Sequence, residues 1–137
     1  MYLQTELAAR AAAGAPVRVC LIGAGKFGSM FLSQVPTTPG LQVSVIADLR
    51  PDAARAACRN VGWTEERIAG TDFIDDAVRA IARDDVDVVI EATGHPPAGI
   101  RHARASFAAG KHIVMVNVEA DVLAGPLLAH EARSAGT

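Results

Sequence analysis

The sequence predicts an α/β protein whose core is a parallel, doubly wound sheet. Short apolar runs alternate with helix-like segments along the 137 residues, which is typical of βαβ units. In addition, a G-x-G-x-x-G pattern stands between the first apolar run and the helix-like segment that follows it. Half of the residues are hydrophobic and 20% are charged, so the chain has the composition of a folded domain.

Five strands and the helices between them are expected in chain order. The strands are the apolar runs at 17–22, 41–47, 68–71, 86–92 and 112–118. The helices are expected at 2–13, at 26–35, at 51–59, in the segment that carries Ile74, Val78 and Ile81 behind Asp72 or Asp75, around Ile100 and Phe107, and at 126–135. Right-handed crossovers then give the strand order 3-2-1-4-5, which is the Rossmann arrangement. The pattern stops where a sixth strand is expected, so we expect that strand to be missing or truncated.

The bulk properties exclude several classes of function. The formal net charge of −2 offers no electrostatic attraction for nucleic acid or for an anionic membrane surface. No run of about 18 apolar residues occurs, so no membrane-spanning helix is expected. Cys20 and Cys58 have no metal-ligand neighbours at short spacing. We therefore predict no metal site and two free thiols that are buried or half-buried, a usage typical of the cytoplasm.

The residues from Gly23 to Gly28 form the strongest candidate site. Gly23 permits a tight turn, Gly25 lets a pyrophosphate approach the backbone, and Gly28 lets the helix pack closely on the strand. Lys26 and Phe27 complete the loop, and the helix N-terminus supplies free N–H groups and a partial positive charge. Because the motif follows a predicted strand and precedes a predicted helix, it indicates dinucleotide binding.

Asp48 and Arg50 bear on which dinucleotide binds. Asp48 follows the second predicted strand, twenty residues after Gly28, where a carboxylate accepts hydrogen bonds from the adenosine ribose and favours NAD. Arg50 stands two residues further on, where a guanidinium accommodates a 2′-phosphate and favours NADP. The two residues favour different cofactors, so the sequence predicts NAD or NADP without choosing between them.

Two later loops are expected at the same edge of the sheet, because the carboxyl ends of parallel strands meet there. Ala92, Thr93 and Gly94 lie at the end of the fourth strand and are predicted to contact the cofactor. Asn117 is polar at the end of an apolar strand, which a buried strand tolerates only with a hydrogen-bond partner. We expect Asn117 either to hold the cofactor or to pin the loop that follows it.

Catalytic side chains are less evident in these loops. His95 is a weak candidate for acid–base chemistry, and we favour the alternative that it is a loop histidine or caps the next helix. Glu119 is a weak candidate carboxylate or simply an acid at the start of a helix. Glu91 is expected to accept backbone N–H bonds at the end of its strand, and His102 and His130 are expected on solvated helix surfaces.

Three stretches resemble the N-terminal domain of homoserine dehydrogenase-like oxidoreductases. They are residues 17–31 (V-R-V-C-L-I-G-A-G-K-F-G-S-M-F), 86–96 (V-D-V-V-I-E-A-T-G-H-P) and 110–128 (G-K-H-I-V-M-V-N-V-E-A-D-V-L-A-G-P-L-L). Within that group they look most like the members with a C-terminal SAF-type domain, which include deoxyxylulose-phosphate reductoisomerase-like enzymes. Homoserine dehydrogenases usually carry Asn-Lys after the fifth strand. Here Asn117 is followed by Val118, which favours the reductoisomerase-like branch.

The resemblance implies NAD(P)-linked chemistry on a small substrate held by a second domain. It implies that the pyrophosphate lies on the glycine loop, the adenosine ribose at Asp48 and Arg50, and the nicotinamide half at Thr93, Gly94 and Asn117. Residues 1–16 are then a helical leader, and residues 17–137 the NAD(P)-binding domain of a longer, homo-oligomeric enzyme. Its catalytic groups are expected beyond the last residue here, so this chain alone is expected to be inactive.

Two other functions are alternatives to an oxidoreductase. A module that senses NAD(H) without performing chemistry needs the same glycine loop, and the fold alone does not separate it from an enzyme domain. A methyltransferase that uses S-adenosylmethionine is disfavoured, because the loop has the length that a pyrophosphate needs and the strand–helix alternation continues through five strands.

Overall fold

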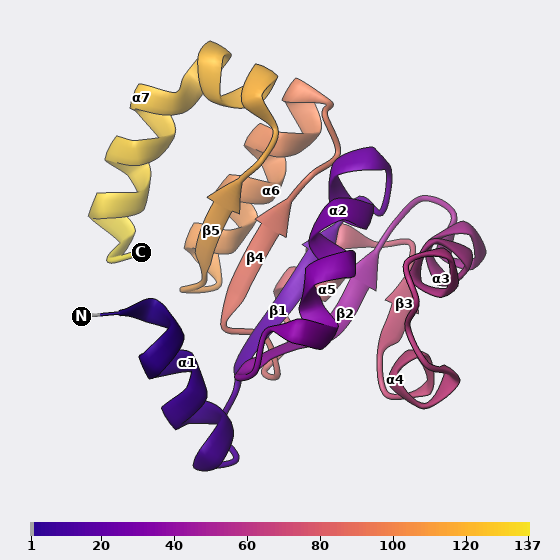
Figure 1. Cartoon of the computed structure of the whole chain (residues 1–137). Coiled ribbons are helices and arrows are strands. Elements are labelled where there is room, and N and C mark those ends of the chain that lie inside the picture. The colour runs from indigo at the N-terminus through magenta and orange to yellow at the C-terminus, as the bar shows by residue number, and fades with distance from the viewer. Residues whose placement is uncertain (1) are drawn as a thin grey trace.

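A computed structural model describes residues 2–137 and shows one five-stranded sheet with the order β3-β2-β1-β4-β5 (Figure 1). All four strand pairings are parallel, which confirms the predicted doubly wound arrangement. The strands are β1 (Val17–Ile22), β2 (Leu41–Ala47), β3 (Asp72–Ile74), β4 (Val88–Glu91) and β5 (His112–Met115). The first two have the bounds that the sequence predicts.

Helices cover both faces of the sheet. One face carries α2 (Lys26–Gln34), the 3₁₀ turn η1 (Val35–Thr37), α3 (Pro51–Asn60) and α4 (Glu65–Ala69); the other carries α5 (Ala77–Ile81) and α6 (Pro96–Ala108). The last helix, α7 (Val118–Ala135), packs on α6. The first helix, α1 (Leu3–Ala12), buries none of its residues and stands beside the layers in Figure 1.

The central strand β1 has a core on each of its faces. Leu21 packs with the α2–α3 cluster, and Cys20 and Ile22 pack with the α5–α6 cluster. A parallel strand covered on both sides has no polar face, which is why the run is almost wholly apolar. Both cysteines are buried free thiols, as predicted, and burial raises the pKa of Cys20 to about 12 and of Cys58 to about 11. The thiols are therefore protonated and unreactive at neutral pH.

The segment between α3 and β4 differs from the prediction. The strand expected at 68–71 is the end of α4 and a turn, and the real strand β3 begins at Asp72. Thr64 accepts a hydrogen bond from the Arg67 N–H and so starts a short helix that buries Ile68. The next helix begins behind Asp76, whose carboxylate accepts from the Arg79 N–H, rather than behind Asp72 or Asp75. A short apolar run does not by itself distinguish a strand from a helical turn.

The C-terminal part also differs. The strand expected to reach residue 118 ends at Met115, and the last helix begins at Val118, not at Pro126. Asn117 starts this helix, because its Oδ1 accepts from the Ala120 N–H at 3.1 Å. Pro126 lies inside α7, where its ring removes one backbone donor without ending the helix.

Candidate functional site

Gly23 and Gly28 are required by the local backbone. Gly23 has φ +90°, and a Cβ there would lie 2.9 Å from the carbonyl oxygen of Ala92 in the loop after β4. A Cβ at Gly28 would collide with the carbonyl oxygen of Gly23. The first and third glycines of the motif thus let β1, the start of α2 and the end of β4 come together at one edge of the sheet.

Gly25 is different, because the fold does not demand a glycine there. Its φ of −73° suits any residue, and a Cβ would meet nothing within 4 Å. Among the described residues no side chain caps α2, α1 or α3, whereas side chains accept from the first turns of α4, α5, α6 and α7. The first N–H groups of α2 thus have no side-chain acceptor and lie next to the open space at Gly25, an arrangement that suits an anion at a helix N-terminus. Lys26 and Phe27 lie exposed at the same end.

The carboxylate of Asp48 is held against the glycine loop. Its Oδ2 accepts from the Ala24 N–H at 2.9 Å, and its Oδ1 accepts from the Arg50 N–H at 2.8 Å. Arg50 is exposed, and Leu49 beside it has 90% of its surface exposed. Leu49 is a further residue of this loop, and its apolar side chain between two charged residues is the feature of the sequence that marks it.

The loop after β4 lies against the glycine loop. The Ala92 N–H donates to the Ile22 carbonyl at 2.8 Å, and the exposed residues Thr93, Gly94 and His95 follow. Nδ1 of His95 accepts from the Ala98 N–H at 3.3 Å, so His95 caps α6 and the favoured helix-capping role is confirmed.

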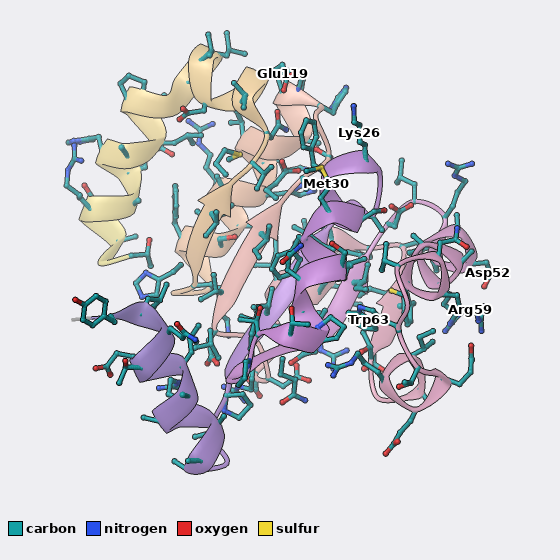
Figure 2. All side chains as sticks on the ribbon, in the orientation of Figure 1. Lys26, Met30, Asp52, Arg59, Trp63 and Glu119 are labelled. Atoms are coloured by element: carbon teal, nitrogen blue, oxygen red, sulfur yellow. The ribbon has the colours of Figure 1, made fainter. Side chains whose placement is uncertain are left out.

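Asn117 connects this loop to the start of α7. Only 1% of its surface is exposed, and its Nδ2 donates to the His95 carbonyl at 3.0 Å and to Thr93 Oγ1 at 3.3 Å. Its Oδ1 accepts from the first turn of α7, so both the donor and the acceptor group of the amide have partners within the chain. Of the two roles expected for Asn117, these contacts correspond to holding the loop. Glu119, two residues after Asn117 in the first turn of α7, is exposed, and Figure 2 shows it with Lys26 at the end of the molecule toward which the strands point.

A buried polar pair lies directly behind the loop. Glu91 has 0% and His102 has 4% of its surface exposed, and Nδ1 of the imidazole lies 3.1 Å from Oε1 of the carboxylate. His102 was expected on a solvated helix surface, and that expectation is wrong. Gly99, Ala103 and Ser106 are also buried, so small residues at helical spacing marked this face of α6.

Glu91 also differs from its expected role, since its side chain bonds other side chains rather than backbone N–H groups. Thr93 Oγ1 donates to Oε1 at 2.6 Å, while Oε2 has no hydrogen-bond partner among residues 2–137. Burial raises the pKa of Glu91, but the hydrogen bonds from His102 and Thr93 outweigh it and hold the pKa below its usual range. Because the ionised carboxylate accepts, the imidazole is assigned the tautomer with its hydrogen on Nδ1.

Other kinds of site find no support in the described part of the chain. Residues 2–137 hold no group of three or more His, Cys, Asp or Glu side chains placed to share a metal ion. Within the same residues, no helix has both the length and the apolar character required to cross a bilayer.

The geometry of the glycine loop agrees with a family match. A model described as "Homoserine dehydrogenase, NAD binding domain" matches residues 23–137. The chain belongs to this family. Its cofactor is accordingly of the NAD or NADP class, and its fold is that of the nucleotide-binding domain of oxidoreductases.

Individual relatives cover the same region. A glycosyl hydrolase family 109 protein of Streptomyces coelicolor is 35% identical over 106 residues, which are 76% of this chain and 22% of that protein. A homoserine dehydrogenase structure from Thiobacillus denitrificans matches 88% of this chain and 28% of its own, with a TM-score of 0.74 and 20% identity. A biliverdin reductase from Synechocystis, in complex with biliverdin and NADP+, matches 89% of this chain and 36% of its own, with a TM-score of 0.67 and 21% identity. These two structures bear on the fold alone, and the chain spans well under half of each relative.

Proposed function

We propose that this chain is the NAD(P)-binding module of an oxidoreductase and positions the nicotinamide for hydride transfer to a substrate on a second domain. The observation that carries the proposal is the open space at Gly25 in front of the uncapped N-terminus of α2. At the two other glycines of the motif, Gly23 and Gly28, neighbouring backbone atoms occupy the space that a side chain would need. The space at Gly25 is free of protein and is faced by N–H donors, as a pyrophosphate requires.

The rest of the dinucleotide is assigned to the neighbouring residues. Asp48 is held so that its remaining lone pairs accept from the adenosine ribose, and the exposed Leu49 offers apolar surface to the adenine ring. The exposed backbone of Thr93 and Gly94 serves the nicotinamide half. When bound, the cofactor supplies the hydride chemistry, and this chain supplies the binding and the orientation.

Narrower features of the protein are part of the same proposal. The V-N-V-E-A-D-V-L stretch supports a reductoisomerase-like member of the homoserine dehydrogenase-like group. We propose a small-molecule substrate, a homo-oligomeric assembly, and catalytic residues outside this chain, with His95 and Glu119 as weak candidates within it. The two free thiols support a cytoplasmic location.

Titration of the chain with NADH and NADPH, followed by thermal unfolding, tests the proposal. A dinucleotide at 100 times its dissociation constant adds about 2.7 kcal/mol to the free energy of unfolding, and S-adenosylmethionine is expected to add nothing. Absence of a shift with both dinucleotides would contradict the proposal.

Asp48→Ala is expected to lower the preference for NADH over NADPH, because it removes the charge that repels a 2′-phosphate. An unchanged ratio would show that Asp48 is not the ribose ligand.

A further inference from the structure

The Glu91–His102 pair lies behind the proposed nicotinamide site and has no part in the binding scheme above. Glu91 is the last residue of β4, and its side chain extends to the face covered by α6, where His102 meets it. Neither side chain reaches the open edge of the sheet, since both are buried. Any function of this pair must therefore pass through a residue that it touches.

The pair is not explained by stability. A buried carboxylate is costly even when it is hydrogen-bonded, and no side chain or backbone group of residues 2–137 meets hydrogen-bond geometry with Oε2 of Glu91. Replacement of a buried ionisable pair by apolar residues of similar volume is often neutral or stabilising. An apolar cluster on the same face of the sheet includes Val89 and Ala105, so apolar residues are already used on this side of the core.

What Glu91 does is hold the hydroxyl of Thr93. Thr93 Oγ1 donates to Glu91 Oε1 at 2.6 Å, a short bond of the charge-assisted kind. The same oxygen accepts from the His95 N–H and from Asn117 Nδ2, both at 3.3 Å. The one donor and two acceptor positions of the hydroxyl are thus all used, which fixes the side chain and the direction of the loop backbone.

The loop held in this way presents unused donors. Within residues 2–137, the backbone N–H groups of Thr93 and Gly94 donate to no acceptor, while the Ala92 N–H is tied to β1. The Thr93 N lies close to Gly23, so these donors stand beside the glycine loop. Their direction depends on the Thr93 hydroxyl, and the hydroxyl depends on Glu91.

We propose that Glu91 and His102 are positioning residues for the nicotinamide half of the dinucleotide. Glu91 fixes Thr93 from inside the sheet, and His102 fixes the rotamer of Glu91. The inference rests on the proposed function, because it assumes that a dinucleotide lies along this edge. It adds that the two halves of the cofactor depend on different residues, the adenosine half being independent of this pair.

The test compares NADH with ADP, which lacks both the nicotinamide and its ribose, on the full chain. The double variant Glu91→Leu/His102→Leu is expected to stay folded and to weaken NADH binding about tenfold, the scale of one or two hydrogen bonds. ADP binding is expected to stay within about twofold of the wild type. Thr71→Val is the matched control, since it removes a buried hydroxyl at the opposite edge of the sheet and is expected to leave both affinities unchanged.

Two further variants keep the test decisive. Thr93→Val removes the hydroxyl that Glu91 holds. It is expected to weaken NADH binding selectively, as the double variant does, and it provides the test even if the double variant folds poorly. Glu91→Gln keeps an acceptor for Thr93 and is expected to retain most of the NADH affinity. Equal weakening of both ligands, or no weakening of either, would overturn the inference. Failure of the wild type to bind both ligands would instead overturn the proposed function, and this inference with it.

Discussion

At the scale of single residues, substitution by alanine is expected to affect different properties at Gly25 and at Gly28. At Gly25 it should weaken cofactor binding, and at Gly28 it should lower the free energy of unfolding. Gly25→Ala places its Cβ in open space, so the free energy of unfolding should change by less than about 0.5 kcal/mol while NADH binding falls at least about tenfold. Gly28→Ala forces its Cβ onto the Gly23 carbonyl and should cost about 2 kcal/mol of stability.

Chemical denaturation and fluorescence titration of the two variants measure these effects. Gly70→Ala is the control, because its Cβ would make only ordinary contacts, at 3.6 Å and beyond, away from the site. If Gly25→Ala bound NADH like the control, the space at Gly25 would not be the pyrophosphate site.

The residues that the sequence revealed are those whose role depends on backbone and spacing. The glycines and Asp48 have fixed offsets from strand ends, so their positions follow from the motif. The contact between Glu91 and His102 was not predicted, because it joins two elements across eleven residues and no local pattern encodes it. Asn117 was found as a polar anomaly in an apolar run, yet its partners in the preceding loop required the structure.

At the scale of elements, the start of α5 offers a controlled comparison of two adjacent acids. Asp76 accepts from the Arg79 N–H at 3.0 Å, whereas the exposed Asp75 has no such role in the described chain. Asp76→Ala should lower the free energy of unfolding by about 1 kcal/mol, and Asp75→Ala should leave it nearly unchanged. Equilibrium denaturation measures both, and equal losses would contradict the assigned cap.

Elements with a strong and uninterrupted pattern were predicted with their true bounds, while those decided by one side chain were not. β1 and β2 are long apolar runs that end in glycine or aspartate, so their limits are explicit in the sequence. The start of α7 depends on the side chain of Asn117, which accepts from the Ala120 N–H. The predicted start lies eight residues too late, because the prediction begins the helix at Pro126. The limits of β3 and α4 depend in the same way on Thr64.

At the scale of the whole molecule, the free energy of unfolding should fall at acid pH. The reason is the loss of a contact between β1 and the residue that directly precedes β4. The guanidinium and backbone N–H of Arg18 both donate to the Asp87 carboxylate, which lowers its pKa to about 2. A carboxyl with a depressed pKa in the folded state stabilises the fold above its unfolded pKa, and this stabilisation is lost as the pH falls toward the folded pKa. The loss should therefore occur between about pH 4 and pH 2.

Asp87→Asn should flatten that part of the stability curve. The contribution is about 1 kcal/mol, because the pair is partly exposed and screened by solvent. Asp52→Asn is the matched control, since the Asp52 side chain is 99% exposed and its ion pair with Arg55 lies in water. Unfolding at several pH values checks this, and a wild-type curve that is parallel to that of Asp87→Asn would contradict it.

The contact of Gly23 with Ala92 joins two segments that lie far apart in the sequence. A Cβ at Gly23 would come within 2.9 Å of the Ala92 carbonyl oxygen, and the next nearest atoms are also backbone atoms of Ala92 and Thr93. The contact therefore depends on the absence of a side chain at residue 23 and not on the side chains of the loop after β4. A chimera that takes residues 23–28 from another nucleotide-binding protein is thus expected to keep this contact as long as the transplanted segment begins with glycine.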